Sequence, residues 1–291
     1  MSRLSAVLFD LDGLLIDSEP VWFRVEQRVM ASLGGPPWRH EDQARCVGGT
    51  LPRTAAYLLG LAGSSATAEL RDGEVPDVEV PDAEASNPSV SDAGMVSRAG
   101  PNGEVPNAEV QRRLVTGMEA ELRSGVPLRP GAAGLLTELV EARIPLALVS
   151  SSYRVLVDAA LDGIGRSHFA VSVAGDEVSH PKPHPEPYLR AARLLGVQPA
   201  SCVVFEDAPT GIAAAEAAGC LCVGVPDVVP ISGTPTRPVL DSLAEVDLGW
   251  LLELPALLSG GGNAAEGRAR PPDPPTTIRS GQSARFTRPT L

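Results

Sequence analysis

The sequence predicts an α/β fold built on a doubly wound parallel sheet, with a helical segment inserted after the first strand. Three observations lead to this prediction. Short apolar runs alternate with helical stretches in the second half of the chain, which is the pattern of βα units around a covered sheet. A similar run, Ala6–Phe9, stands far upstream, across a long stretch with helical periodicity. Polar residues directly follow several runs, where ligands bind in such sheets.

The apolar spacing sets the order of the elements. Ser18 is the expected cap of the first helix and Gly34 its end, and the loop Cys46–Thr50 separates this helix from the next. The helices expected before the second strand cover about residues 18–33, 52–61, 110–122 and 135–140. The later units contain strands at Leu146–Val149, Phe169–Val173, Cys202–Phe205 and Leu221–Val225, with helices at about 156–161, 188–195 and 211–218.

Two segments lack this patterning. Residues 64–109 are acidic, rich in proline and without aromatic residues, and Gly73–Val80 is echoed by Gly103–Val110. Such a stretch cannot bury enough apolar surface to offset the entropy lost on ordering, so we expect a disordered insertion that is open to weak partner binding. Residues 256–291 read as a disordered tail. The expected domains are a catalytic core at 1–16 and 128–255 and a helical cap at 17–127 that contains the insertion.

Composition limits the function classes. The chain has 291 residues and a formal charge of −12, which argues against nucleic-acid binding. No apolar run approaches the roughly 20 residues of a membrane span, and the start does not read as a signal peptide. Four cysteines do not make a disulfide framework in a chain this long. We expect a monomeric cytoplasmic protein with a small-molecule substrate and neither nucleic acid nor a membrane as partner.

Charged and hydroxyl side chains gather at the ends of the expected strands. They are Asp10 and Asp12 after the first strand, Ser150 after the second, Lys182 in the loop after the third, and Glu206 and Asp207 after the fourth. Each alone has a plain explanation, such as a solvated strand end, a helix cap or a surface lysine. Together they supply what phosphoryl transfer through a carboxylate nucleophile needs, including acids that would hold a hard Mg²⁺ ion.

These residues lie in four motifs that resemble those of the haloacid dehalogenase superfamily. The motifs are Phe9-Asp-Leu-Asp-Gly-Leu-Leu-Ile-Asp-Ser-Glu19, Val149-Ser-Ser-Ser152, Lys182-Pro-His-Pro-Glu-Pro-Tyr188 and Phe205-Glu-Asp-Ala-Pro-Thr-Gly211. Within the superfamily, the chain is similar to the β-phosphoglucomutase-like branch and its bacterial hexitol-phosphate and 2-deoxyglucose-6-phosphate phosphatases. The resemblance implies a Rossmann-like core with a small all-helical cap, and a phosphatase that hydrolyses small sugar or polyol phosphates.

The resemblance also implies roles for the site residues. Asp10 would be the nucleophile and Asp12 the acid and base, while Ser150, Ser151 and Lys182 would bind the phosphoryl group. Mg²⁺ would be held by Asp10, the carbonyl of Asp12, Glu206 and Asp207. The candidate substrate contacts from the cap are Glu19, Trp22, Gly49 and Thr50. A cis bond is expected at Lys182–Pro183, and Ala208 departs from the serine that is frequent at its position.

Two alternatives stay open. The mutases of this branch keep a histidine where this chain has Trp22 and an arginine where it has Leu51, which favours transfer to water; Arg53, two residues on, leaves the question unsettled. A phosphosugar mutase is the nearer alternative. A non-catalytic scaffold that recruits partners through the acidic insertion is the other, but it gives the four motifs no purpose.

Overall fold

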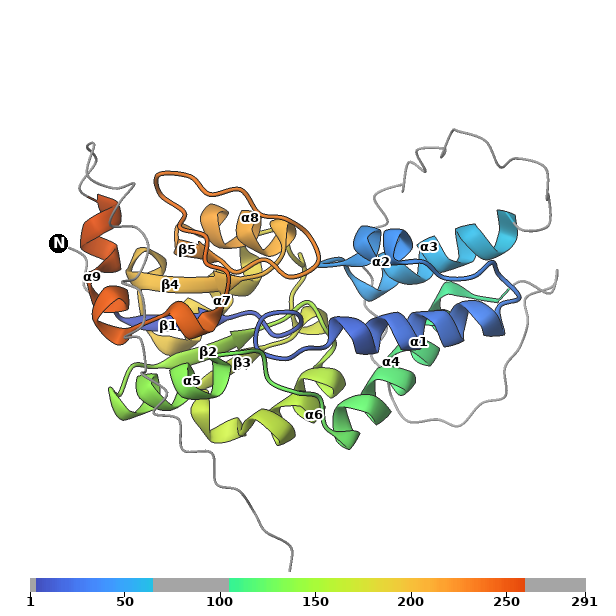
Figure 1. Ribbon diagram of the computed structural model, residues 1–291, viewed down its shortest axis with the longest axis horizontal. Coiled ribbons are helices and arrows are strands. Elements are labelled where there is room, and N and C mark those ends of the chain that lie inside the picture. The colour runs from blue at the N-terminus through green and yellow to red at the C-terminus, as the bar shows by residue number, and fades with distance from the viewer. Residues whose placement is uncertain (1–3, 65–104, 260–291) are drawn as a thin grey trace, which may run out of the picture.

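The computed structural model describes residues 4–64 and 105–259, which form a five-stranded parallel sheet, its flanking helices and a group of helices at one end (Figure 1). The strand order β3-β2-β1-β4-β5 confirms the predicted doubly wound sheet. β1 lies at the centre, with Val7 opposite Leu146 on β2 and opposite Val203 on β4. The strands are β1 (Ala6–Phe9), β2 (Leu146–Val149), β3 (Val171–Val173), β4 (Cys202–Glu206) and β5 (Leu221–Gly224).

The centre of the sheet is buried on both faces, because β1 and β2 are apolar at every position rather than at alternate ones. Val7 and Phe9 of β1 belong to an apolar cluster with α5, α6 and α9, whereas Ala6 and Leu8 belong to a second cluster with α7 and α8. The helices of the core are α5 (Ala132–Glu141), α6 (Arg154–Ile164), α7 (Glu186–Leu195), α8 (Pro209–Ala217) and α9 (Leu248–Ser259). Short 3₁₀ turns lie at Arg166–His168, Gly175–Glu177, Pro199–Ser201 and Leu243–Glu245.

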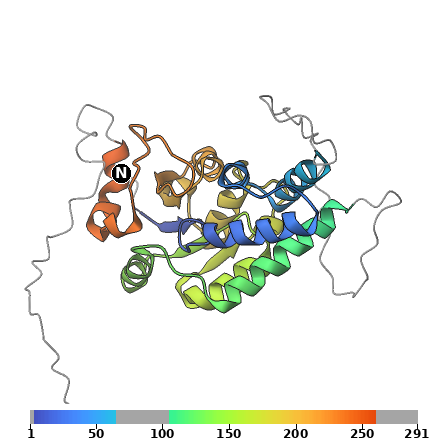
Figure 2. The ribbon, with the colours of Figure 1, turned by 45° about the vertical axis from the view of Figure 1, so that its right-hand side comes forward.

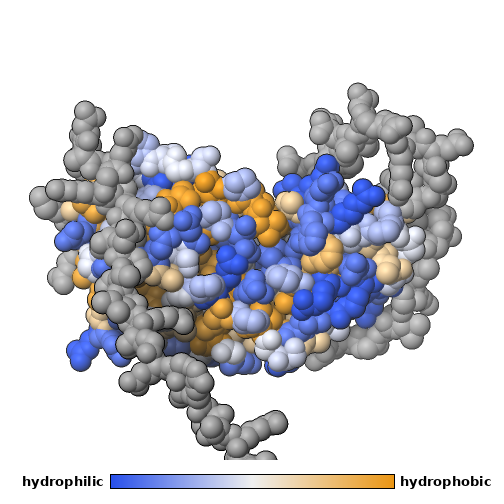
Figure 3. Space-filling model, viewed as in Figure 1, coloured by the Kyte–Doolittle hydropathy of each residue, from blue (hydrophilic) through white to orange (hydrophobic). Residues whose placement is uncertain are grey.

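Among the described residues, the four helices between the paired positions Ile16 and Leu128 form the part that we call the cap. They are α1 (Glu19–Ser32), α2 (His40–Cys46), α3 (Leu51–Ser64) and α4 (Asn107–Ser124). α4 packs against α1 and α3 within the cap and also against α6 of the core, an arrangement visible in Figure 2. In Figure 3, hydrophilic side chains cover much of the cap, and the outline of the molecule is hollowed between the cap and the core. The cap therefore stands beside the carboxyl ends of the strands.

The chain crosses between core and cap twice, and the two crossings are paired. Ile16 and Leu128 form an antiparallel bridge. On either side of it, the Asp17 N–H donates to the Pro127 carbonyl at 2.8 Å, and the Arg129 N–H donates to the Leu15 carbonyl at 2.9 Å. The cap is thus joined to the core by a short two-stranded connection.

Several expected boundaries differ from the structure. α4 begins at Asn107 rather than Val110, because Glu109, which we had placed in the insertion, pairs with Arg113 at 2.9 Å in the first turn of the helix. α9 continues to Ser259, beyond the expected limit of 255. α2 was not predicted, and β3 begins at Val171 rather than Phe169.

The expected insertion and tail lie largely outside the described residues, so their predicted disorder stays a prediction. Within the described ranges, no helix combines the length and the apolar character that crossing a membrane requires.

Candidate active site

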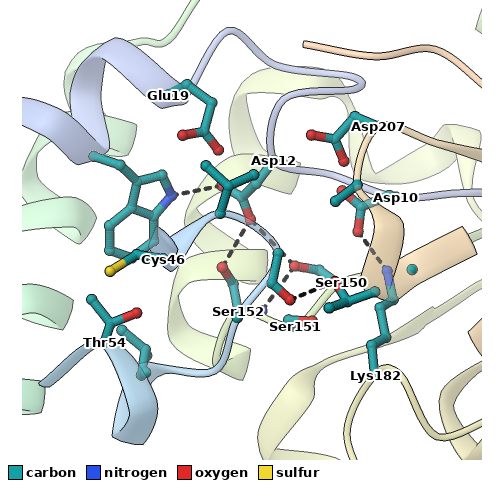
Figure 4. Close-up of a pocket in the computed structure, with 18 of the residues that line it drawn as sticks. Asp10, Asp12, Glu19, Cys46, Thr54, Ser150, Ser151, Ser152, Lys182 and Asp207 are labelled. Carbon is teal, nitrogen blue, oxygen red and sulfur yellow. Dashed lines mark hydrogen bonds and ion pairs between the residues drawn. The ribbon is translucent and has the colours of Figure 1, made fainter. Parts of the chain in front are cut away.

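The expected site residues meet at the carboxyl ends of β1, β2 and β4. β1 ends just before Asp10, β2 just before Ser150, and β4 at Glu206. Lys182 comes from the loop before α7, and its bond to Pro183 is cis. All these side chains line one pocket between the core and the cap (Figure 4). Residues far apart in the sequence therefore form a single site.

Lys182 links the charged residues of the site through hydrogen bonds from its ammonium group. Its Nζ donates to Asp10 Oδ1 at 2.6 Å, to Glu206 Oε1 at 2.6 Å and to the Val149 carbonyl at 2.8 Å. Desolvation would lower the pKa of Lys182, but Asp10 and Glu206 outweigh it and hold that pKa above its ordinary value. The Tyr188 hydroxyl donates to the same Glu206 oxygen. Lys182 is thus a buried ammonium that is fixed beside the first aspartate.

Asp10, Glu206 and Asp207 form a buried set of acids whose nearest oxygens lie within 4.8 Å of one another. Burial raises the pKa of Asp10 to about 8 despite the opposing charge of Lys182, with Glu206 and Asp12 adding to the rise. Burial likewise raises the pKa of Asp207, with repulsion from Asp10 and Glu206 adding to it. Closely spaced oxygen donors whose charges repel fit a hard divalent cation such as Mg²⁺.

Two glycines make room for these acids. A Cβ at Gly211 would lie 1.9 Å from Glu206 Oε1, and a Cβ at Gly13 would lie 2.4 Å from Asp207 Oδ2. Gly13 also has a φ of +79°, a backbone conformation that side chains disfavour. Both positions need glycine for the carboxylates to take up their places.

Asp12 is held by four donors. Its Oδ1 accepts from Ser18 Oγ at 2.9 Å and from Trp22 Nε1 at 3.1 Å. Its Oδ2 accepts from Ser152 Oγ at 2.8 Å and more weakly from Ser150 Oγ at 3.4 Å. Figure 4 shows the carboxylate between the cap and the serine loop. The second aspartate is therefore fixed from both sides of the pocket.

This arrangement corrects one interpretation of the sequence. Ser18 does stand at the start of α1, but its side chain makes no capping hydrogen bond and turns to Asp12 instead. The serine loop after β2 does not cap α6 either, because Tyr153 occupies the cap position. Ser150 Oγ accepts from the Ser152 N–H at 3.0 Å, and Ser151 lines the pocket.

The cap contributes an acidic wall to the pocket. Glu19 and Glu26 of α1 are both buried there, and Gln43 of α2 donates to Glu19 Oε2 at 3.0 Å. Burial, with Asp12 and Asp227 adding to it, raises the pKa of Glu19 to about 8. No basic side chain pairs with this wall, because the one basic residue among the described residues that line the pocket is Lys182, which is bound to Asp10 and Glu206 of the core.

A loop of the cap touches the core directly. Thr210 Oγ1, in the first turn of α8, donates to the Gly48 carbonyl at 2.8 Å. A Cβ at Gly48 would lie 2.5 Å from Thr210 Oγ1 and 2.8 Å from the Cβ of Ala208, and Gly48 has a φ of +67°. Ala208, which departs from the expected serine, thus lies under the cap loop.

Comparison with known proteins adds to this geometry. The family model of the haloacid dehalogenase-like hydrolases matches residues 4–219. The chain belongs to this family. Together with the phosphatases among its relatives, the match makes the protein an enzyme, a phosphoric monoester hydrolase of the haloacid dehalogenase superfamily.

Two curated proteins and one solved structure illustrate what this hydrolase is similar to. Hexitol phosphatase B of Escherichia coli K12 is 31% identical over 255 residues, covering 87% of this chain and 96% of that protein. Protein CbbY of Rhodobacter capsulatus is 32% identical over 224 residues, covering 75% and 83%. The crystal structure of CbbY from Rhodobacter sphaeroides in complex with phosphate is 26% identical with a TM-score of 0.60, covering 84% of this chain and 96% of that one.

Most of the expected site residues of the hydrolase share the pocket, and one does not. Glu19, Trp22 and Gly49 of the cap line it with the core residues, whereas Thr50 does not and instead accepts the Thr54 N–H through its carbonyl at the start of α3. Sequence reasoning missed Ser18 and Ser152 as partners of Asp12, although both stand inside the quoted motifs. It also missed pocket residues in the cap, namely Glu26, Gln43 and Thr54.

Proposed function

We propose that this hydrolase is a Mg²⁺-dependent phosphatase of small sugar or polyol phosphates that works through an aspartyl phosphate on Asp10. The observation that carries the proposal is the meeting of Asp10 with Lys182 at 2.6 Å, beside the Glu206 and Asp207 acids and within reach of Asp12. The hexitol phosphatase B relative, aligned over most of both chains, supports a sugar or polyol phosphate as substrate.

In this mechanism the core residues divide the bond-making, proton transfer and phosphate binding among themselves. Asp10 attacks the phosphorus atom, the bond to the ester oxygen breaks, and Asp12 gives its proton to the leaving alcohol. Asp12 then takes a proton from a water molecule as that water attacks the aspartyl phosphate, which frees phosphate and restores Asp10. Lys182 and the serine loop, including Ser150 and Ser151, hold the phosphoryl oxygens as charge develops on them.

The acids would hold Mg²⁺ through Asp10, Glu206, Asp207 and the carbonyl of Asp12. When bound, the ion supplies positive charge that offsets the clustered carboxylates and the phosphoryl oxygens. The pKa of Asp10, raised by burial to about 8, makes this offset necessary, because the nucleophile acts in its ionised form.

The pocket favours water over a sugar hydroxyl as the second acceptor. Trp22, in the place of the mutase histidine, is a hydrogen-bond donor to Asp12 and cannot exchange protons as an imidazole does. Leu51 lines the pocket, whereas Arg53 is exposed and is not among its lining residues. Among the described residues that line the pocket, the cap therefore offers no cation for a second phosphate, which the bisphosphate intermediate of a phosphosugar mutase would carry.

Phosphate release and isomerisation, measured on one panel of phosphorylated sugars and polyols, test the proposal. We expect Mg²⁺-dependent phosphate release that chelation abolishes and Mg²⁺ restores. Asp10→Asn is expected to lower turnover by at least about 10³-fold and to remove acid-stable labelling by ³²P, since the amide is no nucleophile. Retained turnover in Asp10→Asn would contradict a covalent intermediate, and isomerised product without free phosphate would identify a mutase.

A further inference from the structure

A carboxyl group deep in the cap wall, that of Glu26, has no task in the chemistry proposed above. Glu26 lies on α1 and is only 3% exposed, yet it lines the pocket. Trp38 Nε1 donates to its Oε2 at 3.1 Å, and its other oxygen accepts no hydrogen bond from the described residues. That oxygen is not fully enclosed by protein atoms, and Glu26 lines the pocket, so a molecule in the pocket can reach it. A buried polar group needs partners, and this one has a place for a further partner.

The position of Glu26 along α1 determines how far a group bound to Glu26 lies from the reacting phosphate at Asp10 and Asp12. Glu19, Trp22 and Glu26 share one face of the helix because they are spaced at i, i+3 and i+7. Trp22 contacts Asp12, the residue next to the leaving oxygen, and Glu26 comes one turn later, about 6 Å further along the helix. A substrate carbon chain that leaves Asp12 and follows α1 into the cap therefore reaches Glu26 only if it is several carbons long.

The charge of this wall decides which group can bind there. Burial, and then the charge of Glu19, raise the pKa of Glu26 to about 8, so at neutral pH the carboxyl group keeps a proton that it can donate. A hydroxyl group can accept a hydrogen bond from this protonated oxygen, and it can donate one to the same oxygen when the carboxyl group is ionised. A phosphate at the same place would meet two carboxyl groups and no basic side chain from the described lining.

We propose that Glu26 forms a distal subsite that binds a hydroxyl group near the far end of a five- or six-carbon polyol monophosphate and excludes a second phosphate there. The proposal rests on the phosphatase function and adds the length and charge of the substrate. The subsite positions and selects the substrate, while the bond changes stay with the core residues.

Substrates of different length test the subsite in the wild type and in two variants. We expect Glu26→Leu to raise the KM for sorbitol 6-phosphate at least tenfold and to leave kcat/KM for glycerol 3-phosphate, which is too short to reach Glu26, within twofold. Glu26→Gln, which keeps a donor and an acceptor, is expected to stay within threefold of wild type on both. Gln27→Leu, an exposed neighbour on α1, is the matched control and should change neither.

Wild-type enzyme gives a second measurement that needs no variant to fold. Its kcat/KM for sorbitol 6-phosphate should exceed that for the matching hexitol 1,6-bisphosphate at least a hundredfold. A bisphosphate that is turned over equally well would overturn the proposal, as would a loss in Glu26→Leu that is equal on long and short substrates or absent from both. Failure of the wild type to hydrolyse either monophosphate would instead overturn the proposed function.

Discussion

Asp12 shows how single residues of the cap act on the chemistry of the core. Among the described residues, Trp22 is the one donor to this carboxylate from the cap apart from Ser18 at the junction, while Ser150 and Ser152 donate to it from the core. A proton donor must present its carboxyl group at the leaving oxygen in a fixed orientation. The position of α1 is therefore coupled to the orientation of the catalytic acid.

Replacing Trp22 with Phe tests this coupling. A hydrogen bond to a charged group is worth about 1.5–3 kcal/mol, so we expect kcat to fall about tenfold or more while the fold is kept. Steady-state kinetics on p-nitrophenyl phosphate, with a thermal melt, measure both. Trp250→Phe is the control, because the Trp250 indole N–H is buried in the core without a hydrogen-bond partner among the described residues. An unchanged kcat in Trp22→Phe would show that the serines alone orient Asp12.

Glu26 should make stability depend on pH. Its pKa is about 8 in the folded protein and near 4.5 when exposed, so the folded state binds the proton more tightly. The contribution of this bound proton to the free energy of unfolding is complete below pH 4.5. It falls by about 1.4 kcal/mol per pH unit as the pH rises from 4.5 to 8, where it is lost. Glu26→Gln should therefore gain stability relative to wild type between pH 5 and pH 8, as measured by urea unfolding. Parallel curves for the two proteins would contradict this.

At the scale of residues, the core of the site could be predicted, but the cap side of the pocket could be predicted only in part. Asp10, Ser150 and Asp207 directly follow strands, and parallel strands bring their carboxyl ends to one edge of the sheet whatever the loops do. Glu26 gave only a weak signal. It sits beside Val25 on the apolar face of α1, and whether such a residue meets solvent, a salt bridge or a pocket depends on helices that pack from elsewhere in the chain.

Among the elements, the loop between α2 and α3 decides how the cap meets the core. Its Gly48 lies against Thr210 and Ala208 of the core with no room for a side chain. α2 could not be predicted because its seven residues are mostly polar, and its place is set by tertiary bonds such as Gln43 to Glu19 and the Tyr57 hydroxyl to Asp42. Longer helices with an apolar face, such as α1, were predictable for the opposite reason.

Gly48→Ala tests this contact. The φ of +67° makes alanine cost about 1 kcal/mol, and its Cβ would also force the loop away from α8. We expect kcat/KM to fall at least tenfold on any phosphate ester. Gly34→Ala is the matched control, because Gly34 has a φ of +70° and nothing within 4 Å, so it should lose similar stability and keep full activity. Equal activities in the two variants would show that the contact has no part in catalysis.

In the molecule as a whole, the pocket draws on the chain between Asp10 and Thr54 and between Ser150 and Gly211. Residues 65–104 contribute none of its described lining, so we expect a linker in their place to preserve kcat/KM within twofold. The linker has to span α3, because Asn107 donates to the Pro52 carbonyl at 3.1 Å and Ser64 lies about 18 Å further along the helix.

A ten-residue Gly/Ser linker reaches about 33 Å and is therefore long enough. Direct fusion of Ser64 to Val105 spans only about 11 Å to Asn107 and should unwind the end of a helix, lowering the melting temperature. Lost activity with the long linker would show that the replaced segment takes part in function.

The sequence-based expectations of a monomer and of a cytoplasmic location stay predictions.

The paired crossings at Ile16 and Leu128 have a consequence for how such an enzyme can change over time. The segments around Ile16 and Leu128 are hydrogen-bonded to each other at the base of the cap. With respect to the core, the chain between them is therefore a single loop whose two ends are held together. Lengthening a closed loop adds little entropic cost, which grows only with the logarithm of its length. Helices can be gained, lost or reshaped on the far side of this junction while the nucleophile stays in register, so substrate range can diverge without rebuilding the catalyst.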